Sequence, residues 1–217
     1  MSGRTILFDL DGTLTNSAPG IIGSLKKALA RLGYPEPAPD LLRRFIGPPM
    51  FGSLEKFCKM SPAEADEAVR VYRGIYNRTG VYENEVYPGI PDLLDRLRES
   101  GAKLAVATTK PAFATAKVLE HFALSPRFDF VSAADESERE SNKKGLILTA
   151  LRALDCPPER AVMVGDTKFD AEGARDAGTD FIGVLYGFGT RGEMEREGAR
   201  RFAPDVFTLG GMLIDKA

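Results

Sequence analysis

Histidine and tryptophan are nearly absent, because the 217-residue sequence contains one histidine, His121, and no tryptophan. A serine–histidine–aspartate triad and a multi-histidine metal site both depend on positioned imidazole rings. His121 lies in the helical pattern Leu-Glu-His-Phe-Ala and is expected on a helix surface. The sequence offers almost no material for histidine-based chemistry, so any catalysis must rest on carboxylates.

Cysteine is also scarce. Cys58 and Cys156 have neither the density of a disulfide scaffold nor the close spacing of a zinc site. The opening residues enter a strand-like run without the charged, apolar and small-residue regions of an export signal. A reduced, cytoplasmic setting is the expectation that fits both features.

The sequence has neither an excess of one charge nor a long apolar run. Lysine and arginine number 29 against 31 for aspartate and glutamate, a formal net charge of −2. This balance gives no global field for nucleic acid, and no apolar run approaches the roughly 20 residues of a membrane span. We expect a small-molecule partner rather than a nucleic acid polymer or a membrane. A monomer and a homodimer both remain open.

Short apolar runs rich in β-branched residues alternate with helical patterns over most of the chain. The runs are 5–8, 103–108, 128–133, 161–164 and 181–186, and the later ones are separated by helical patterns from Pro111, Lys143 and Ala171. Strand and helix in alternation indicate parallel strands with crossover helices. The predicted fold class is α/β, with a doubly wound parallel sheet.

Residues 16–86 interrupt this alternation with helical patterns and no convincing strand. Ser17 or Asn16 can cap a helix that Gly33 is placed to end, and Ser61 with Glu64 forms a capping-box pattern. The apolar stripe of the first helix is Ile21, Ile22, Leu25, Ala28, Leu29 and Leu32. We therefore predict a core of residues 1–15 and 87–217 and an inserted helical cap of residues 16–86.

Two acids follow the first predicted strand, in Asp9-Leu10-Asp11-Gly12-Thr13. At the carboxyl end of a parallel strand both can point into the crevice where such sheets bind ligands. Two close carboxylates repel, so the arrangement implies a shared proton or a metal ion. Gly12 permits a tight turn. Asp11-Gly12 as ordinary turn chemistry is the alternative.

Three further segments carry candidate functional residues. The run 105–110 ends in Thr108, Thr109 and Lys110, and two lysines, Lys143 and Lys144, precede a predicted helix. The run 161–170 is a buried strand that ends in Gly-Asp-x-x-x-Asp, with Asp166 and Asp170 as its acids. Carboxylate oxygens are ligands that suit magnesium.

Together the four segments resemble the motifs of the haloacid dehalogenase-like hydrolase superfamily, in their order along essentially the whole chain. The helical insert after the first motif is similar to the subgroup with a small helical cap. Within it, the sequence looks most like the phosphoglycolate phosphatase and 5′-nucleotidase branch. The resemblance also implies that the first strand lies between those bearing Thr108 and Asp166.

The resemblance implies a role for each motif residue. Asp9 would attack phosphorus to form an aspartyl phosphate, and Asp11 would serve as acid and then base. Mg²⁺ would be held by Asp9, the Asp11 carbonyl and Asp166, with Asp170 supporting the site through water or the lysine. The phosphoryl oxygens would be held by Thr108, Lys143 and the amides of Leu10 and Gly12, with Thr109 nearby. Lys143 fits the spacing better than Lys144.

The cap is expected to hinge near 15–18 and 84–88 and to supply substrate contacts. The candidates lie in 43–49, where Arg43 or Arg44 could meet an anionic group beside the stiff Gly47 loop. A solvated helix end is the alternative for both arginines. The loop 187–192 is expected near the mouth of the site, and the acidic run 135–140 is expected to be a solvated loop.

Several functions are compatible with these motifs. A Mg²⁺-dependent phosphatase acting on a small ester, phosphoglycolate or a nucleoside 5′-monophosphate above all, is the leading hypothesis, with a sugar phosphate or broad activity also open. A β-phosphoglucomutase-like mutase is the alternative, although Thr13 favours hydrolysis. A dehalogenase would leave Asp11 without a role, and a receiver domain would be shorter. A non-catalytic phosphate-binding protein is the alternative from another class.

Overall fold

A six-stranded sheet forms the centre of the protein in the computed structural model, which describes residues 4–135 and 143–214. The strand order is β5-β4-β1-β6-β7-β8, and every neighbouring pair is parallel. The strands are β1 (Thr5–Phe8), β4 (Lys103–Pro111), β5 (Phe130–Ala134), β6 (Ala161–Gly165), β7 (Asp180–Val184) and β8 (Phe202–Ala203). The predicted α/β class is confirmed, as is the position of β1 between β4 and β6.

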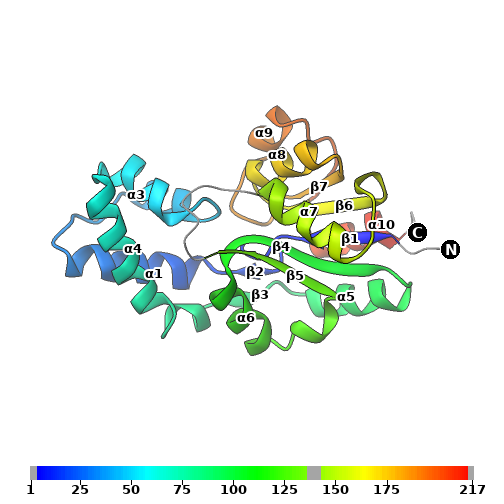
Figure 1. The fold of residues 1–217 in the computed structure, drawn as a ribbon, viewed down its shortest axis with the longest axis horizontal. Helices are drawn as coiled ribbons and strands as arrows, with labels where there is room; N and C mark the ends of the chain where they lie inside the picture. Colours follow the sequence, from blue (N-terminus) through cyan, green and yellow to red (C-terminus); the bar gives the residue numbers. More distant parts are fainter. Residues whose placement is uncertain (1–3, 136–142, 215–217) are drawn as a thin grey trace.

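Both faces of the sheet are covered by helices, as Figure 1 shows. Alternate residues of a strand point to opposite faces. In β1, Leu7 packs in the cluster that includes Ile147 of α7, whereas Ile6 and Phe8 pack in the cluster of the other face. One face carries α7 (Lys143–Ala153) and α8 (Lys168–Ala177), and the other carries α5 (Ile90–Glu99), α6 (Ala112–His121) and α10 (Val206–Ile214).

The helical segment between β1 and α5 extends away from the sheet (Figure 1). It contains α1 (Ala18–Arg31), α2 (Pro39–Leu42), α3 (Met50–Cys58) and α4 (Pro62–Tyr76), with 3₁₀ turns η1 (Arg43–Phe45) and η2 (Gly80–Tyr82). Helix α4 starts with the predicted capping box of Ser61 and Glu64 and packs on α1 and α3. At the start of α1 it is the Asn16 side chain that accepts a hydrogen bond, from the Ala18 amide at 3.4 Å, whereas the Ser17 hydroxyl makes no capping hydrogen bond. The division into two domains stays a prediction.

Two short strands that the sequence did not suggest join this segment to the core. Strands β2 (Thr15–Asn16) and β3 (Glu85–Val86) pair in antiparallel fashion, so the expectation of no strand between 15 and 87 was wrong. Two residues are too few for the alternation by which strands are recognised. Strand β8 was not predicted either, because it also has only two residues. The chain thus leaves the core and returns to it at adjacent points.

The other elements are short. They are α9 (Arg191–Arg196), η3 (Ser125–Arg127) and η4 (Pro158–Arg160). Helix α8 begins at Lys168 rather than at the predicted Ala171, because Thr167 and Asp170 form a capping box at its start. Within the described ranges, none of the helices combines the length and apolar character needed to cross a bilayer.

Candidate active site

Three adjacent strands bring the predicted catalytic residues to one edge of the sheet. Asp9 directly follows β1, Thr108 lies in β4 and Asp166 follows β6. The Asp9 amide donates to the Val164 carbonyl at 2.9 Å, which extends the β1–β6 ladder to the site. All three side chains are buried. The carboxyl edge of the sheet therefore holds two buried acids and a hydroxyl close together.

Lys143, the first residue of α7, joins two of the acids. Its Nζ lies 2.7 Å from Asp9 Oδ1 and 2.7 Å from Asp170 Oδ1, and it donates to the Ala107 carbonyl at 2.9 Å. Burial lowers the pKa of the Lys143 ammonium, but Asp170 and Asp9 more than offset this, so the pKa is raised. Lys144 is exposed. The structure therefore sets Lys143, and not Lys144, against Asp9.

Asp166 is held in a narrow space between two glycines. It accepts hydrogen bonds from the Phe188 amide at 2.7 Å and from Thr13 Oγ1 at 3.3 Å. A Cβ on Gly12 would lie 2.2 Å from Asp166 Oδ2, and one on Gly187 would lie 2.4 Å from its Cβ. Gly12 also has φ +91°, and its amide donates to the Thr15 carbonyl at 2.7 Å. That amide is already engaged, so Gly12 serves mainly to make room for Asp166.

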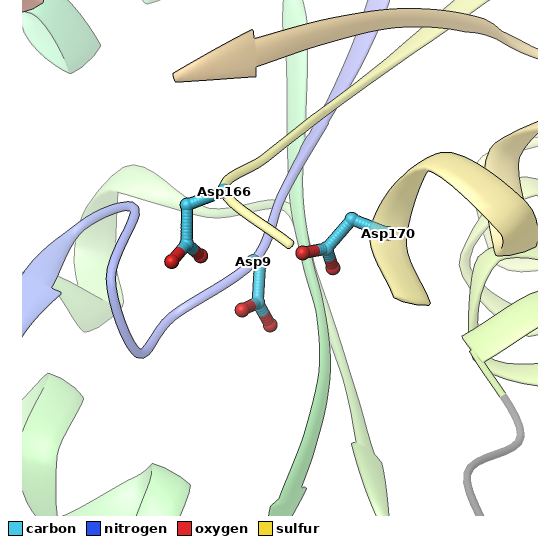
Figure 2. A group of neighbouring side chains, drawn as sticks. All are labelled: Asp9, Asp166 and Asp170. Carbon is cyan, nitrogen blue, oxygen red and sulfur yellow. The ribbon is translucent and has the colours of Figure 1, made fainter. Parts of the chain in front are cut away.

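Asp9, Asp166 and Asp170 form a buried carboxylate cluster, in which one oxygen from each lies within 4.8 Å of the others. Figure 2 shows their side chains converging from the end of β1, the end of β6 and the start of α8. Burial raises the pKa of Asp9 to about 6 despite Lys143, and raises that of Asp166 well above its ordinary value. One lysine among three acids leaves negative charge uncompensated. A hard divalent cation such as Mg²⁺ fits this donor set.

Asp11 faces a different partner, which the sequence did not reveal. Lys110 Nζ donates to both of its carboxylate oxygens, at 3.0 and 2.9 Å, and both side chains are buried. The ammonium also lies 4.7 Å from the centre of the Tyr76 ring, which belongs to α4. A signal was present, since Thr108 and Lys110 are two apart in a strand and share a face, as Asp9 and Asp11 do before the turn.

The two threonines of β4 have separate roles. Thr108 Oγ1 accepts from the Lys110 amide at 3.2 Å, and its side chain is buried in the core beside the site. Thr109 Oγ1 donates to the Gly47 carbonyl at 3.0 Å. Gly47 adopts φ +102°, where a glycine is favoured. Thr109 therefore connects the core to the loop 47–49 of the helical segment.

The loop 47–49 separates two hollows. The inner cavity, about 110 Å³, is bordered by Asp11, Gly47, Lys110 and the α4 face that carries Tyr76. The outer groove, about 730 Å³, is bordered by Thr167, Phe188 and both arginines of η1. Arg44 lies over the Phe57 ring at 5.7 Å and does not border the inner cavity. Of the two predicted substrate contacts, Gly47 thus lies beside Asp11 and Arg44 does not.

One loop was expected near the mouth of the site, and the acidic run was expected to be a solvated loop. Phe188 and Gly189, in the predicted loop 187–192, border the outer groove, and the Phe188 amide binds Asp166. Asp135 borders the inner cavity and is exposed, while 136–140 of the acidic run lie outside the described residues. His121 packs edge-on against Tyr82. Among the described residues it makes no contact with Asp9, Asp166 or Asp170.

The structure brings Asp9, Lys143, Asp166 and Asp170 together at one edge of the sheet, and comparison with known proteins identifies the family. A family model for haloacid dehalogenase-like hydrolases matches residues 6–184. The chain belongs to this hydrolase family. A crystal structure of a predicted phosphatase from Clostridium acetobutylicum superposes on the hydrolase with a TM-score of 0.93 at 34% identity, covering 99% of this chain and 100% of that one.

Curated relatives are similarly close to this hydrolase. A 5′-nucleotidase of Pseudomonas aeruginosa is 38% identical, covering 96% of this chain and 94% of the relative. A phosphoglycolate phosphatase of Aquifex aeolicus is also 38% identical, covering 85% and 86%. The tyrosine-protein kinase PtkA of Mycobacterium tuberculosis is 39% identical, but the match spans only 64% of that protein and 87% of this one. The chain is an enzyme of the hydrolase class, and its relatives are consistent with a phosphomonoesterase.

Proposed function

We propose that the protein is a Mg²⁺-dependent phosphatase that hydrolyses a small, diffusible phosphate monoester in the cytoplasm through an aspartyl phosphate on Asp9. Phosphoglycolate and a nucleoside 5′-monophosphate are the leading substrates. The names of the Pseudomonas aeruginosa and Aquifex aeolicus relatives support this choice. The observation that carries the proposal is the buried contact of 2.7 Å between Lys143 Nζ and Asp9 Oδ1 at the open edge of the sheet.

Asp9 is suited to be the nucleophile. Lys143 holds one of its oxygens and leaves the other to attack phosphorus in line with the ester oxygen. The bond from phosphorus to the ester oxygen breaks as the bond to the carboxylate forms. The ammonium also reduces the repulsion between Asp9 and an anionic phosphoryl group. Asp170, 2.7 Å from the same ammonium, fixes the position of Lys143.

Asp11 is suited to move the proton. It borders the inner cavity, on the side where a departing group would lie. As an acid it would protonate the departing alkoxide, which requires a protonated Asp11 released from the Lys110 ammonium that both of its oxygens now accept from. As a base it would then take a proton from the water that hydrolyses the aspartyl phosphate. Thr108 Oγ1 is a donor for the phosphoryl oxygens. The loop 47–49, joined to Thr109, would limit entry of other acceptors.

The buried carboxylate cluster would hold the metal ion. Asp9 and Asp166 would be direct ligands, together with the Asp11 carbonyl, and Asp170 would support them. When bound, Mg²⁺ neutralises carboxylate and phosphoryl oxygens, which favours the approach of nucleophile and substrate. Phe188 and Thr13 orient Asp166 for this task by the two hydrogen bonds that they donate to it.

Phosphate release from a panel of monoesters, with Mg²⁺ and with EDTA, tests the proposal. The panel holds p-nitrophenyl phosphate, phosphoglycolate and adenosine 5′-monophosphate. We expect Mg²⁺-dependent release by the wild type, none by Asp9→Asn, and a phosphorylated Asp9 peptide after rapid quench. Retention of full activity by Asp9→Asn, or no release from any ester, would contradict the proposal.

A further inference from the structure

One face of α4 borders the inner cavity and contains an unexpected charge. Val69, Tyr72, Arg73 and Tyr76 are spaced at i, i+3, i+4 and i+7, so they lie on one stripe of the helix. All four border the cavity, and Phe45 and Phe51 add further apolar surface. An arginine on an otherwise apolar and aromatic stripe is a costly choice for packing alone.

The Arg73 side chain is also without an anionic partner. Arg73 is half-buried, and across residues 4–135 and 143–214 its guanidinium makes no hydrogen bond or ion pair. The other two cations near the site are satisfied, since Lys110 binds Asp11 and Lys143 binds Asp9 and Asp170. Asp135 borders the same cavity but makes no ion pair with Arg73. A partly desolvated guanidinium of this kind is suited to binding an anion.

The position of Arg73 determines which part of a substrate it would meet. Under the proposed mechanism Asp11 marks the side of the departing group, and Asp11 and Arg73 border the same cavity. Arg73 would therefore contact the departing group and not the phosphoryl group, which lies with Asp9 and Lys143. A planar guanidinium can bind a carboxylate through two parallel hydrogen bonds.

The size of the cavity bears on the size of the departing group. A volume of about 110 Å³ holds roughly ten water-sized groups at most, at 10–15 Å³ each. This volume accommodates a departing group of a few heavy atoms. The aromatic and aliphatic part of the lining, which includes Phe45, Val69 and Tyr72, suits a short carbon chain.

We propose that Arg73 recognises a carboxylate on the departing group, so that the preferred substrate is the phosphate ester of a small hydroxy acid. This inference rests on the proposed function and names the substrate class. Of the two leading substrates, it favours phosphoglycolate over a nucleoside 5′-monophosphate. Arg73 is then a specificity-determining residue that acts on the organic part of the ester.

The test compares three esters of equal chain length that differ in terminal charge: phosphoglycolate, 2-hydroxyethyl phosphate and 2-aminoethyl phosphate. We expect the wild type to favour phosphoglycolate in kcat/KM. Arg73→Met should lower kcat/KM for phosphoglycolate about 10- to 100-fold, mainly through KM, and change that for 2-hydroxyethyl phosphate less than about threefold. Arg73→Lys should recover part of the loss. Arg70→Met, in the exposed Arg70–Glu67 pair of the same helix, is the matched control.

A uniform loss on all three esters in Arg73→Met would show a merely structural role and overturn the inference. So would a wild type that treats the three esters alike or prefers adenosine 5′-monophosphate, and in that case the proposed phosphatase function would stand. Absence of release from every ester would instead remove the proposed function. Calorimetric binding of phosphoglycolate to Asp9→Asn, with and without Arg73→Met, then tests Arg73 directly, since equal affinities would overturn its role.

Discussion

The two sides of the active site treat their carboxylates in different ways. On one side, Asp9 and Asp170 share Lys143, Asp166 completes the cluster without contacting that lysine, and burial raises the pKa values of Asp9 and Asp166. On the other, Asp11 and Lys110 form a matched pair in which each charge has one partner. The first side is electrostatically incomplete and calls for a further cation, whereas the second is balanced. Removing a charge should therefore have different consequences on the two sides.

The largest effect is expected for Lys143→Met. This change leaves buried Asp9 and Asp170 without the cation that they share, so we expect about 3–5 kcal/mol lower unfolding free energy in EDTA and a kcat lower by about 10²- to 10³-fold. Urea denaturation and phosphate release measure the two quantities. Lys144→Met, one residue along α7, should leave both nearly unchanged. Equal effects of the two variants would break the assignment of Lys143.

A smaller effect is expected for Lys110→Met. This substitution leaves the buried Asp11 carboxylate without a cationic partner, so we expect the free energy of unfolding to fall by about 3 kcal/mol. Because the pair is balanced, removing both charges in Lys110→Met/Asp11→Asn should restore part of the stability, although that variant is inactive. Urea denaturation of both variants decides the matter. A double variant no more stable than the single one would show that Lys110 acts by packing and not by charge.

The smallest effect is expected for metal addition. If Mg²⁺ completes the carboxylate cluster, Mg²⁺ at one hundred times its Kd should stabilise the fold by about 2.7 kcal/mol, seen as a higher Tm. The Lys110→Met variant should still be stabilised by Mg²⁺, because Lys110 is not part of the carboxylate cluster. The Asp166→Asn variant should lose this stabilisation. If Mg²⁺ raises the Tm of Asp166→Asn as much as that of the wild type, the carboxylate cluster is not the Mg²⁺ site and the contrast between the two sides is wrong.

Much of this site was predictable from local sequence signals. Asp9, Asp11, Asp166 and Asp170 each follow or lie close to a buried strand, which places them at the carboxyl edge of a parallel sheet. The order of the strands came from the family resemblance and was confirmed. Lys143 stands at the start of a clear helical pattern. The roles assigned to these residues stay predictions until activity is measured.

Other features depend on contacts that no local pattern encodes. Lys110 meets Asp11 across 99 residues of sequence, and although each lies two residues from another site residue, that spacing does not identify the partner. Gly187 matters because Asp166 and the Gly12 carbonyl fill the space that a side chain would take. Arg44 lies over the Phe57 ring and borders the outer groove, and this contact between separate elements leaves no mark in the local sequence.

The pairing of β2 with β3 has a consequence for how such a protein can change over evolution. Asn16 and Glu85 are register partners, so the ends of everything between them are already held together. The free energy of closing a loop rises only slowly with its length. A shorter, longer or unrelated insert could therefore be spliced at these two residues without opening the sheet, although it would change the contacts that Thr109 and Lys110 make with Gly47 and Tyr76. The selectivity of the enzyme and its chemistry can thus diverge independently, because they lie on separable stretches of one gene product.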